Sequence, residues 1–405
     1  MPVACPDLPD LMPVPGVKLA SAAAGIRYKG RDDLLLVELA EGSQCAAVFT
    51  RNAFCAAPVI VARQHLATST PRYLLINSGN ANAGTGDPGV AAAKDSCGLL
   101  AQRAGCAMEQ VLPFSTGVIG EPLPVERIEA VLDKAIIGLS EDAWATAART
   151  IMTTDTVPKG VSRVVDLAGQ QIVITGIAKG SGMIRPDMAT MLAYIATDAN
   201  IDPRSLQACL DEAVEQSFNR ITVDGDTSTN DACVLMASGV AQMPMLSVGQ
   251  PAFKSFSAAV SDICRQLAQL IVRDAEGATK FVTVQIEDGV DSEECLRVAY
   301  TIAHSPLVKT ALFASDPNWG RILAAIGRAG IKDLDTRSVD IALDDVWIVR
   351  GGGRDPDYRE EAGQRVMSQE EILIRVRLGR GKACETVWTC DLSHEYVKIN
   401  AEYRS

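Results

Sequence analysis

The residues best suited to chemistry lie in one stretch, KGSGMIRPDMATMLAYIATD, at residues 179–198. Lys179, Arg185 and Asp187 precede an apolar segment, and Thr190 stands at its entrance. A Thr hydroxyl is a poor nucleophile unless a base lies beside it. If the chain were cut before Thr190, the new α-amine could act as that base near neutral pH. Spacing alone leaves two interpretations open: a turn that leads into a core strand, or an active site with Thr190 as its nucleophile.

Five other polar stretches have the composition of loops that wrap small molecules. They are NSGNANAGTG (77–86), PFSTGVIG (113–120), IMTTDTVPK (151–159), TVDGDTSTNDA (222–232) and RDAEGATK (273–280). In the second stretch, the hydroxyl of Thr116 and the N–H of Gly117 could both donate to an oxyanion. For each stretch the alternative is a turn built from Gly, Asn, Asp and Thr, and this alternative is favoured for the first.

Three of these stretches carry further indications. The first opens a helix, where backbone N–H groups suit an anion. Asp224 and Asp226 could bind a hard cation, but they lack the spacing of a calcium loop, so we expect no metal site. Glu276 ends a long predicted helix, where a carboxylate opposes the helix dipole, and this placement hints at a substrate role.

Strands and helices throughout the chain must position these residues. Apolar β-branched runs predict strands, and apolar residues three or four apart predict helices. The predicted strands are 34–39, 45–50, 73–79, 191–197 and 281–288, with a hairpin over 162–180 that turns near Ala168-Gly169. The predicted helices are 89–105 with a stop at Gly105, 124–139, 202–218 with Asp202 as N-cap, 253–274, 292–303 and 318–327.

Composition limits the classes of protein to which the chain can belong. Its 405 residues suffice for two or three domains, and an apolar fraction of 47% argues against disorder. A net charge of -12 argues against a nucleic-acid partner. The chain shows neither an apolar run long enough to cross a membrane nor a signal peptide at its start. Beyond residue 330 it becomes charged and strand-like, which predicts a smaller C-terminal α+β part.

Cysteine and histidine usage points to a cytoplasmic protein without a metal centre. The 11 cysteines show no CxxC spacing, so reduced thiols fit better than disulfides or a zinc site. His65, His304 and His394 each stand alone, which is weak support against a metal hydrolase or a Ser-His-Asp hydrolase.

The polar stretches together resemble those of the ornithine acetyltransferase (ArgJ) family, the glutamate N-acetyltransferases of arginine biosynthesis. The resemblance covers essentially the whole chain. It rests on PVPG (13–16), NSGNANAGTG, STG, MTTDT, AKGSGMI, ATML, DGDTSTND, RDAEGATK, SDPNWGRI and a C-terminal Y-x-x-x-N. The resemblance implies an α/β (α+β) layered sandwich of the ArgJ/DmpA-like type with a smaller C-terminal α+β domain.

Members of this family cleave themselves before the Thr of ATML. The resemblance therefore implies cleavage between Ala189 and Thr190, an α chain of 1–189 that carries the oxyanion hole, and a β chain from Thr190. Within the β chain, 190–330 would belong to the same core as the α chain, and 331–405 would form the smaller strand-rich part that closes the site. The two chains would associate as a heterotetramer of two α and two β chains.

The resemblance also assigns roles to residues of this sequence. Thr190 would be the nucleophile, with Thr116 and Gly117 as the oxyanion hole. The substrate-binding residues would be Thr153, Lys179, Thr190, Glu276, Asn400 and Ser405, where Thr154 is an alternative to Thr153. No cofactor or metal is implied.

The implied reaction moves an acetyl group from N²-acetyl-L-ornithine to L-glutamate through acetyl-Thr190. Some family members also accept acetyl-CoA, and the sequence does not separate the two kinds, so acetyl-CoA remains a candidate co-substrate. One alternative is an amidase or aminopeptidase that uses the same N-terminal Thr. Another is a non-catalytic protein with an intact chain that binds an amino acid.

Overall fold

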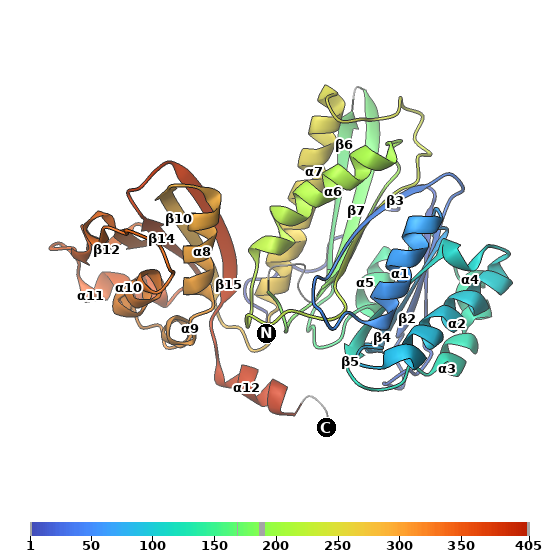
Figure 1. Cartoon of the computed structure of the whole chain (residues 1–405), viewed down its shortest axis with the longest axis horizontal. Helices are drawn as coiled ribbons and strands as arrows, with labels where there is room; N and C mark the ends of the chain where they lie inside the picture. The colour runs from blue at the N-terminus through green and yellow to red at the C-terminus, as the bar shows by residue number, and fades with distance from the viewer. Residues whose placement is uncertain (1, 168, 186–190, 403–405) are drawn as a thin grey trace. The chain divides into compact units, whose positions relative to one another are not determined.

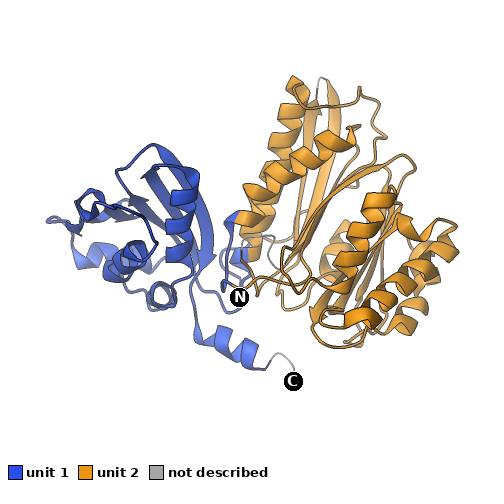
Figure 2. Ribbon diagram, viewed as in Figure 1, with its two compact units in different colours: residues 1–6, 220–225, 272–405 blue, residues 7–219, 226–271 orange. Residues whose placement is uncertain are grey.

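The computed structural model describes residues 2–167, 169–185 and 191–402, and these residues form two compact units (Figure 2). The larger unit consists of residues 7–219 and 226–271. The smaller unit consists of residues 1–6, 220–225 and 272–405. Each unit has its own sheet structure and its own hydrophobic core, so we describe them separately.

A five-stranded sheet in the larger unit carries the segment on either side of the predicted cleavage site. Its strand order is β3 (Gln44–Phe49), β9 (Ala232–Ala237), β8 (Leu192–Thr197), β7 (Gln170–Lys179) and β6 (Lys159–Leu167). All residues of β8 and β9 are buried, as expected for central strands covered on both faces. Helices α6 (Pro203–Glu215) and α7 (Pro251–Arg273) run along this sheet (Figure 1).

A four-stranded sheet in the same unit carries the predicted oxyanion residues. Its order is β1 (Val17–Ala22), β2 (Leu34–Leu39), β4 (Tyr73–Asn80) and β5 (Val111–Val118). Strands β4 and β5 are parallel, and the long helix α2 (Gly86–Ala104) connects them. The short helices α3 (Val125–Glu129) and α4 (Leu132–Ile137) pack with α2 in a core on this side of the sheet.

The two sheets of the larger unit share one hydrophobic core. Phe114 of β5 and Tyr194 of β8 meet edge to face in it, with ring centroids 5.5 Å apart. Helices α1 (Ala57–Thr68) and α5 (Trp144–Thr150) contribute further buried side chains, among them the fully buried Trp144. Sheets packed on a common core, with helices outside, confirm the predicted layered α/β sandwich.

The smaller unit is built on a six-stranded mixed sheet. Its order is β13 (Gly353–Arg354), β12 (Val346–Arg350), β11 (Asp340–Leu343), β14 (Glu371–Arg377), β10 (Phe281–Gly289) and β15 (Ala383–Cys390). Helices α8 (Ser292–Ala303), α9 (Pro306–Phe313), α10 (Trp319–Gly327) and α11 (Glu360–Met367) supply the rest of its core. Helix α12 (His394–Ala401) follows β15, and a short 3-10 helix at Thr336–Ser338 precedes β11. Other short 3-10 helices lie at Met108–Gln110, in the larger unit, and at Phe218–Arg220, where the chain passes between the units.

The smaller unit begins earlier in the chain than the change in composition near residue 330. Strand β10 pairs with β14 in parallel, from Phe281 opposite Glu371 to Glu287 opposite Arg377, and with β15 on its other side. Residues 281–289 therefore fold with the C-terminal strands, because a parallel partner is supplied by a distant segment that composition does not reveal. The division into 1–189 and 190–405 by cleavage remains a prediction.

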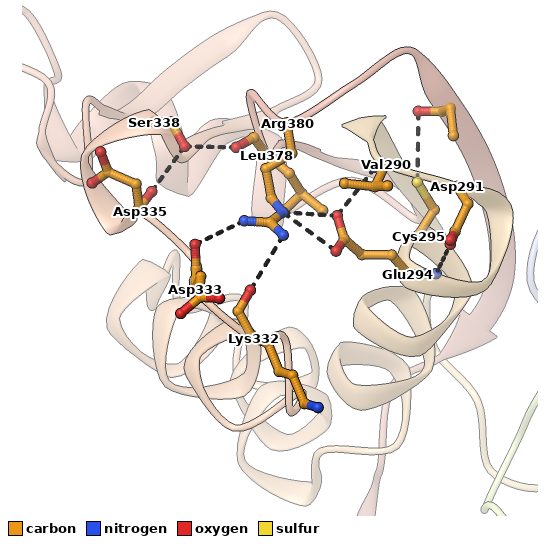
Figure 3. Close-up of polar contacts among 11 residues, drawn as sticks. Val290, Asp291, Glu294, Cys295, Lys332, Asp333, Asp335, Ser338, Leu378 and Arg380 are labelled. Carbon is orange, nitrogen blue, oxygen red and sulfur yellow. Dashed lines mark hydrogen bonds and ion pairs between the residues drawn. The ribbon is translucent and has the colours of Figure 1, made fainter.

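One polar cluster joins three loops of the smaller unit (Figure 3). The Arg380 guanidinium donates from Nε to both carboxylate oxygens of Glu294, at 3.1 and 3.3 Å. It also donates to the carbonyl oxygens of Asp333 and Lys332, at 2.8 and 3.2 Å. The planar fork of arginine can bind a carboxylate and two carbonyls at once, so this side chain ties the loop after β14 to the first turn of α8 and to the loop after α10.

Most local predictions are confirmed. The hairpin forms from β6 and β7, Gly105 ends α2 with a φ of +67°, and Asp202 caps α6 by accepting the N–H groups of Arg204 and Ser205. The single helix predicted over 124–139 is wrong: α3 ends at Glu129, the Val131 N–H then bonds to the carbonyl oxygen of Ile128, and α4 begins at Leu132. Among the described residues, no helix is long and apolar enough to cross a membrane.

Candidate active site

The described part of the candidate site centres on a contact between the ends of β5 and β7. The Lys179 Nζ atom lies 3.1 Å from Thr116 Oγ1 and donates a hydrogen bond to it, and both side chains are buried. Because Thr116 Oγ1 accepts from an ammonium, its own hydroxyl proton can be directed to another acceptor. The contact thus brings together one predicted oxyanion donor and one predicted substrate-binding cation.

Gly117 occupies a position that only glycine can fill. Its φ is +137°, and a Cβ there would lie 2.2 Å from the carbonyl carbon of Gly79 on the neighbouring strand. The absent side chain therefore lets β4 and β5 approach closely at this point. This explains Gly117 as a requirement of the backbone, in addition to its predicted role as an oxyanion donor.

A buried carboxylate, Asp155, organises the backbone around Lys179. Asp155 Oδ1 accepts hydrogen bonds from Lys159 Nζ at 2.8 Å and from the Gly180 N–H at 2.7 Å, and Oδ2 accepts from the Thr153 N–H at 3.0 Å. Burial opposes the ionisation of Asp155. The Lys159 and Lys179 charges and the Gly180 N–H outweigh it and hold the pKa of this carboxyl well below its usual range.

A second buried carboxyl, Asp231, holds the first described residue after the predicted cleavage site. Its Oδ1 accepts the Met191 N–H at 2.9 Å, whereas Oδ2 has no hydrogen-bond partner among the described residues. Burial raises the pKa of Asp231 well above its usual value, although the Met191 N–H and the Lys179 charge act against this shift. The shift favours the protonated form of Asp231.

This assignment predicts the behaviour of an Asp231→Asn variant, which keeps the shape of a protonated carboxyl. The folded state binds the Asp231 proton more tightly than the unfolded state does. The contribution of this residue to stability is thus complete below its unfolded-state pKa and is lost as pH rises towards its folded-state pKa. Above the unfolded-state pKa, the free energy of unfolding in urea should therefore fall with rising pH in the wild type relative to Asp231→Asn. Asp231→Ala should lose about 1–3 kcal/mol, because the buried Met191 N–H is left unpaired.

The smaller unit contains a separate polar group formed by two other predicted residues. The Asn400 amide donates from Nδ2 to Glu276 Oε2 at 2.8 Å and to the carbonyl oxygen of Tyr396 at 3.0 Å. The Tyr396 hydroxyl in turn lies 3.2 Å from Asp224 Oδ2. Glu276 and Asn400 are therefore in contact, and their assignment to substrate binding stays a prediction; Thr190, Ala189 and Ser405 lie outside the described residues.

The asparagine side chains of residues 77–86 bind backbone groups. Asn77, Asn80 and Asn82 are buried and donate to backbone carbonyl oxygens, as the structural interpretation of this stretch expects. The described residues include no group of three or more metal-ligating side chains. The Thr153 N–H binds Asp155, and the Thr154 hydroxyl lies 3.4 Å from Ser181 Oγ, so neither contact decides between the two threonines.

Sequence reasoning missed Asp155, Lys159 and Asp231 as members of this region. All three lie in or beside stretches that it singled out, but it gave them no role. The available signal was a charged residue next to a buried strand: Lys159 begins β6, and Asp231 directly precedes β9. A charge at such a position needs a partner, and the partner could not be identified without the fold.

Comparison with known proteins gives matches over the length of the chain. Residues 18–405 match the model of the ArgJ family. The arginine biosynthesis bifunctional protein ArgJ of Pseudomonas syringae pv. tomato is 57% identical over 406 residues, covering 100% of both chains. Its namesake from Methylococcus capsulatus is 59% identical over 395 residues, covering 98% of this chain and 97% of that protein. A crystal structure of the Bacillus halodurans namesake is 40% identical, covers 51% of this chain and 97% of that chain, and has a TM-score of 0.49.

Proposed function

Because the chain belongs to the ArgJ family, we propose that it is an acetyltransferase of arginine biosynthesis that transfers acetyl from N²-acetyl-L-ornithine to L-glutamate. Relatives that match its full length are named arginine biosynthesis bifunctional proteins, which supports this assignment. Within the structure, the observation that carries the proposal is the contact of Lys179 with Thr116, which places a cation beside a hydroxyl donor.

The proposed reaction has two acyl-transfer steps. The Thr190 hydroxyl attacks the acetyl carbonyl of acetylornithine while the α-amine of Thr190 takes its proton. Thr116 and Gly117 donate to the tetrahedral oxyanion. The C–N bond of the tetrahedral intermediate then breaks, and the leaving nitrogen of ornithine receives the proton from the Thr190 α-amine. Ornithine departs, and acetyl-Thr190 remains. Attack by the glutamate α-amine on this ester releases N-acetylglutamate and restores the hydroxyl.

Two of the substrate-binding residues are charged, and each is proposed to bind a substrate group of opposite charge. Lys179 is proposed to bind the α-carboxylate, and Glu276 the side-chain ammonium of ornithine. Thr153, Asn400 and Ser405 would supply further polar contacts. Glutamate has no side-chain ammonium, so in the second step the Glu276 carboxylate would have no oppositely charged partner on the substrate.

A transfer assay tests this function directly. Acetylornithine is incubated with the protein, with and without glutamate, and ornithine, acetate and N-acetylglutamate are measured. We expect formation of N-acetylglutamate in equal amount to ornithine when glutamate is present. Glutamate-independent release of acetate as the main product would instead identify a hydrolase with the same nucleophile.

The proposal extends to a second acetyl donor and to the assembly. Since the relatives are named bifunctional, we propose acetyl-CoA as a second acetyl donor, with glutamate as the acceptor. Release of the free CoA thiol measures this reaction. We further propose that α and β chains from one precursor associate as two of each. Native mass spectrometry should then show a mass close to twice the 43.0 kDa of the full chain.

A further inference from the structure

Lys179 is well placed for an α-carboxylate because of where that group lies in both substrates. In acetylornithine, the carbon that bears the carboxylate is bonded to the acetylated nitrogen. In glutamate, the equivalent carbon is bonded to the attacking nitrogen. A cation beside Thr116 could thus contact the carboxylate in both steps while the acetyl oxygen occupies the oxyanion site.

Two buried carboxyl groups act on the Lys179 charge and could compete with a substrate for it. Asp155 and Asp231 both interact electrostatically with Lys179, and both are buried. Charges interact strongly in a buried site because water screens them weakly there. An ionised carboxylate without its own counter-ion would therefore weaken the attraction of Lys179 for a substrate carboxylate.

Asp155 has its own counter-ion in Lys159. The two side chains form an ion pair of 2.8 Å, and neither is exposed to solvent. The Gly180 and Thr153 N–H groups occupy two further acceptor positions of Asp155. A fully buried pair of this kind is weak as a source of stability, since desolvation offsets the attraction, so a functional reason for it is worth seeking.

Burial opposes a charge on Asp231, which would otherwise compete for Lys179. Asp155, by contrast, is held in its ionised form by the Lys159 ammonium at 2.8 Å and by the Gly180 and Thr153 N–H groups.

We infer that Asp155 and Lys159 are positioning residues for substrate recognition: Asp155 holds the backbone at Thr153 and Gly180, and Lys159 prevents Asp155 from becoming the counter-ion of Lys179. The inference rests on the function proposed above. It assigns α-carboxylate affinity to a three-residue arrangement rather than to Lys179 alone.

A Lys159→Met variant tests this inference. Removal of the Lys159 charge leaves Asp155 to interact with Lys179, so the KM for acetylornithine and for glutamate should each rise about tenfold. The value of kcat should change by less than about twofold, because the nucleophile and the oxyanion donors remain in place. The rate of reaction with p-nitrophenyl acetate, which has no carboxylate, should likewise change by less than about twofold.

The double variant Asp155→Asn/Lys159→Met separates charge from positioning. It removes both charges and keeps a side-chain oxygen that can accept the Gly180 N–H, so the KM should return to within about threefold of the wild type. This variant also decides the question if Lys159→Met does not fold. Lys309→Met, which removes another buried ammonium that binds Thr389 and Cys390, controls for loss of stability and should leave KM unchanged.

The outcomes distinguish the inference from the proposed function. If the wild type transfers no acetyl from acetylornithine to glutamate, the proposed function is wrong. If the wild type is active, the inference is overturned by a Lys159→Met variant with unchanged KM, or with equal losses on acetylornithine and p-nitrophenyl acetate. A double variant whose KM stays raised tenfold also overturns it.

Discussion

Thr190→Ala is expected to yield a single full-length chain with no acetyl transfer. Without the hydroxyl, the chain has no group to attack the preceding carbonyl, so cleavage between Ala189 and Thr190 does not occur. The intact peptide bond also leaves no α-amine to act as base. We expect kcat/KM for transfer to fall on the order of 10⁴-fold or more, the scale seen when a nucleophile is removed.

A denaturing gel and N-terminal sequencing check this prediction together with the transfer assay. Active wild-type protein should show two fragments, the second beginning at Thr190. Thr190→Ser keeps a hydroxyl and should retain cleavage. Thr68→Ala is a matched control, because the exposed Thr68 hydroxyl bonds only within its own helix, to Gln64 and His65. Transfer by Thr190→Ala, or a single full-length band from active wild type, would remove Thr190 from its role.

Gly117→Ala is expected to destabilise the larger unit and to abolish transfer. The new Cβ would lie 2.2 Å from the carbonyl carbon of Gly79, an atom of the backbone that cannot rotate away. A φ of +137° adds strain for any residue with a side chain. Strain of roughly 1–3 kcal/mol and overpacking of a similar size give a loss of about 4 kcal/mol.

The Gly120→Ala variant distinguishes backbone strain from overpacking as the cause of the loss. Gly120 also has a positive φ, +86°, but no atom lies within 4 Å of the position that its Cβ would take. Its replacement should cost only the backbone strain, about 1–2 kcal/mol. Urea unfolding of both variants measures the difference, and equal losses would show that the close approach of Gly79 and Gly117 contributes nothing.

Local structure could largely be predicted from the sequence because its causes lie within a few residues. Gly105 ends α2 and Asp202 caps α6 through contacts with the adjacent turn of the chain. The apolar run after Thr190 becomes the buried strand β8 for the same reason. The break between α3 and α4 was missed because the apolar residues keep a helical spacing across it, from Ile128 to Leu132.

The same distinction between local and tertiary causes holds for the candidate site. The residue types of Thr116, Gly117, Lys179 and Glu276, in their polar stretches, were sufficient for a resemblance to predict their roles, and those roles remain predictions. The partners of these residues were not predictable. Asp155 meets Gly180 because the β6–β7 hairpin brings its two ends together, and Asp231 meets Met191 because β8 and β9 lie side by side.

The sequence by itself therefore determined the family, the fold class and the stretch in which cleavage is expected, since residue types and local spacing carry that information. Only the tertiary structure decided which charges are buried together. Lys159 pairs with Asp155, and the pKa of Asp231 is raised, because burial removes the water that would otherwise screen or solvate each charge. The ionisation of a side chain depends on neighbours from other strands, and the fold alone brings them together.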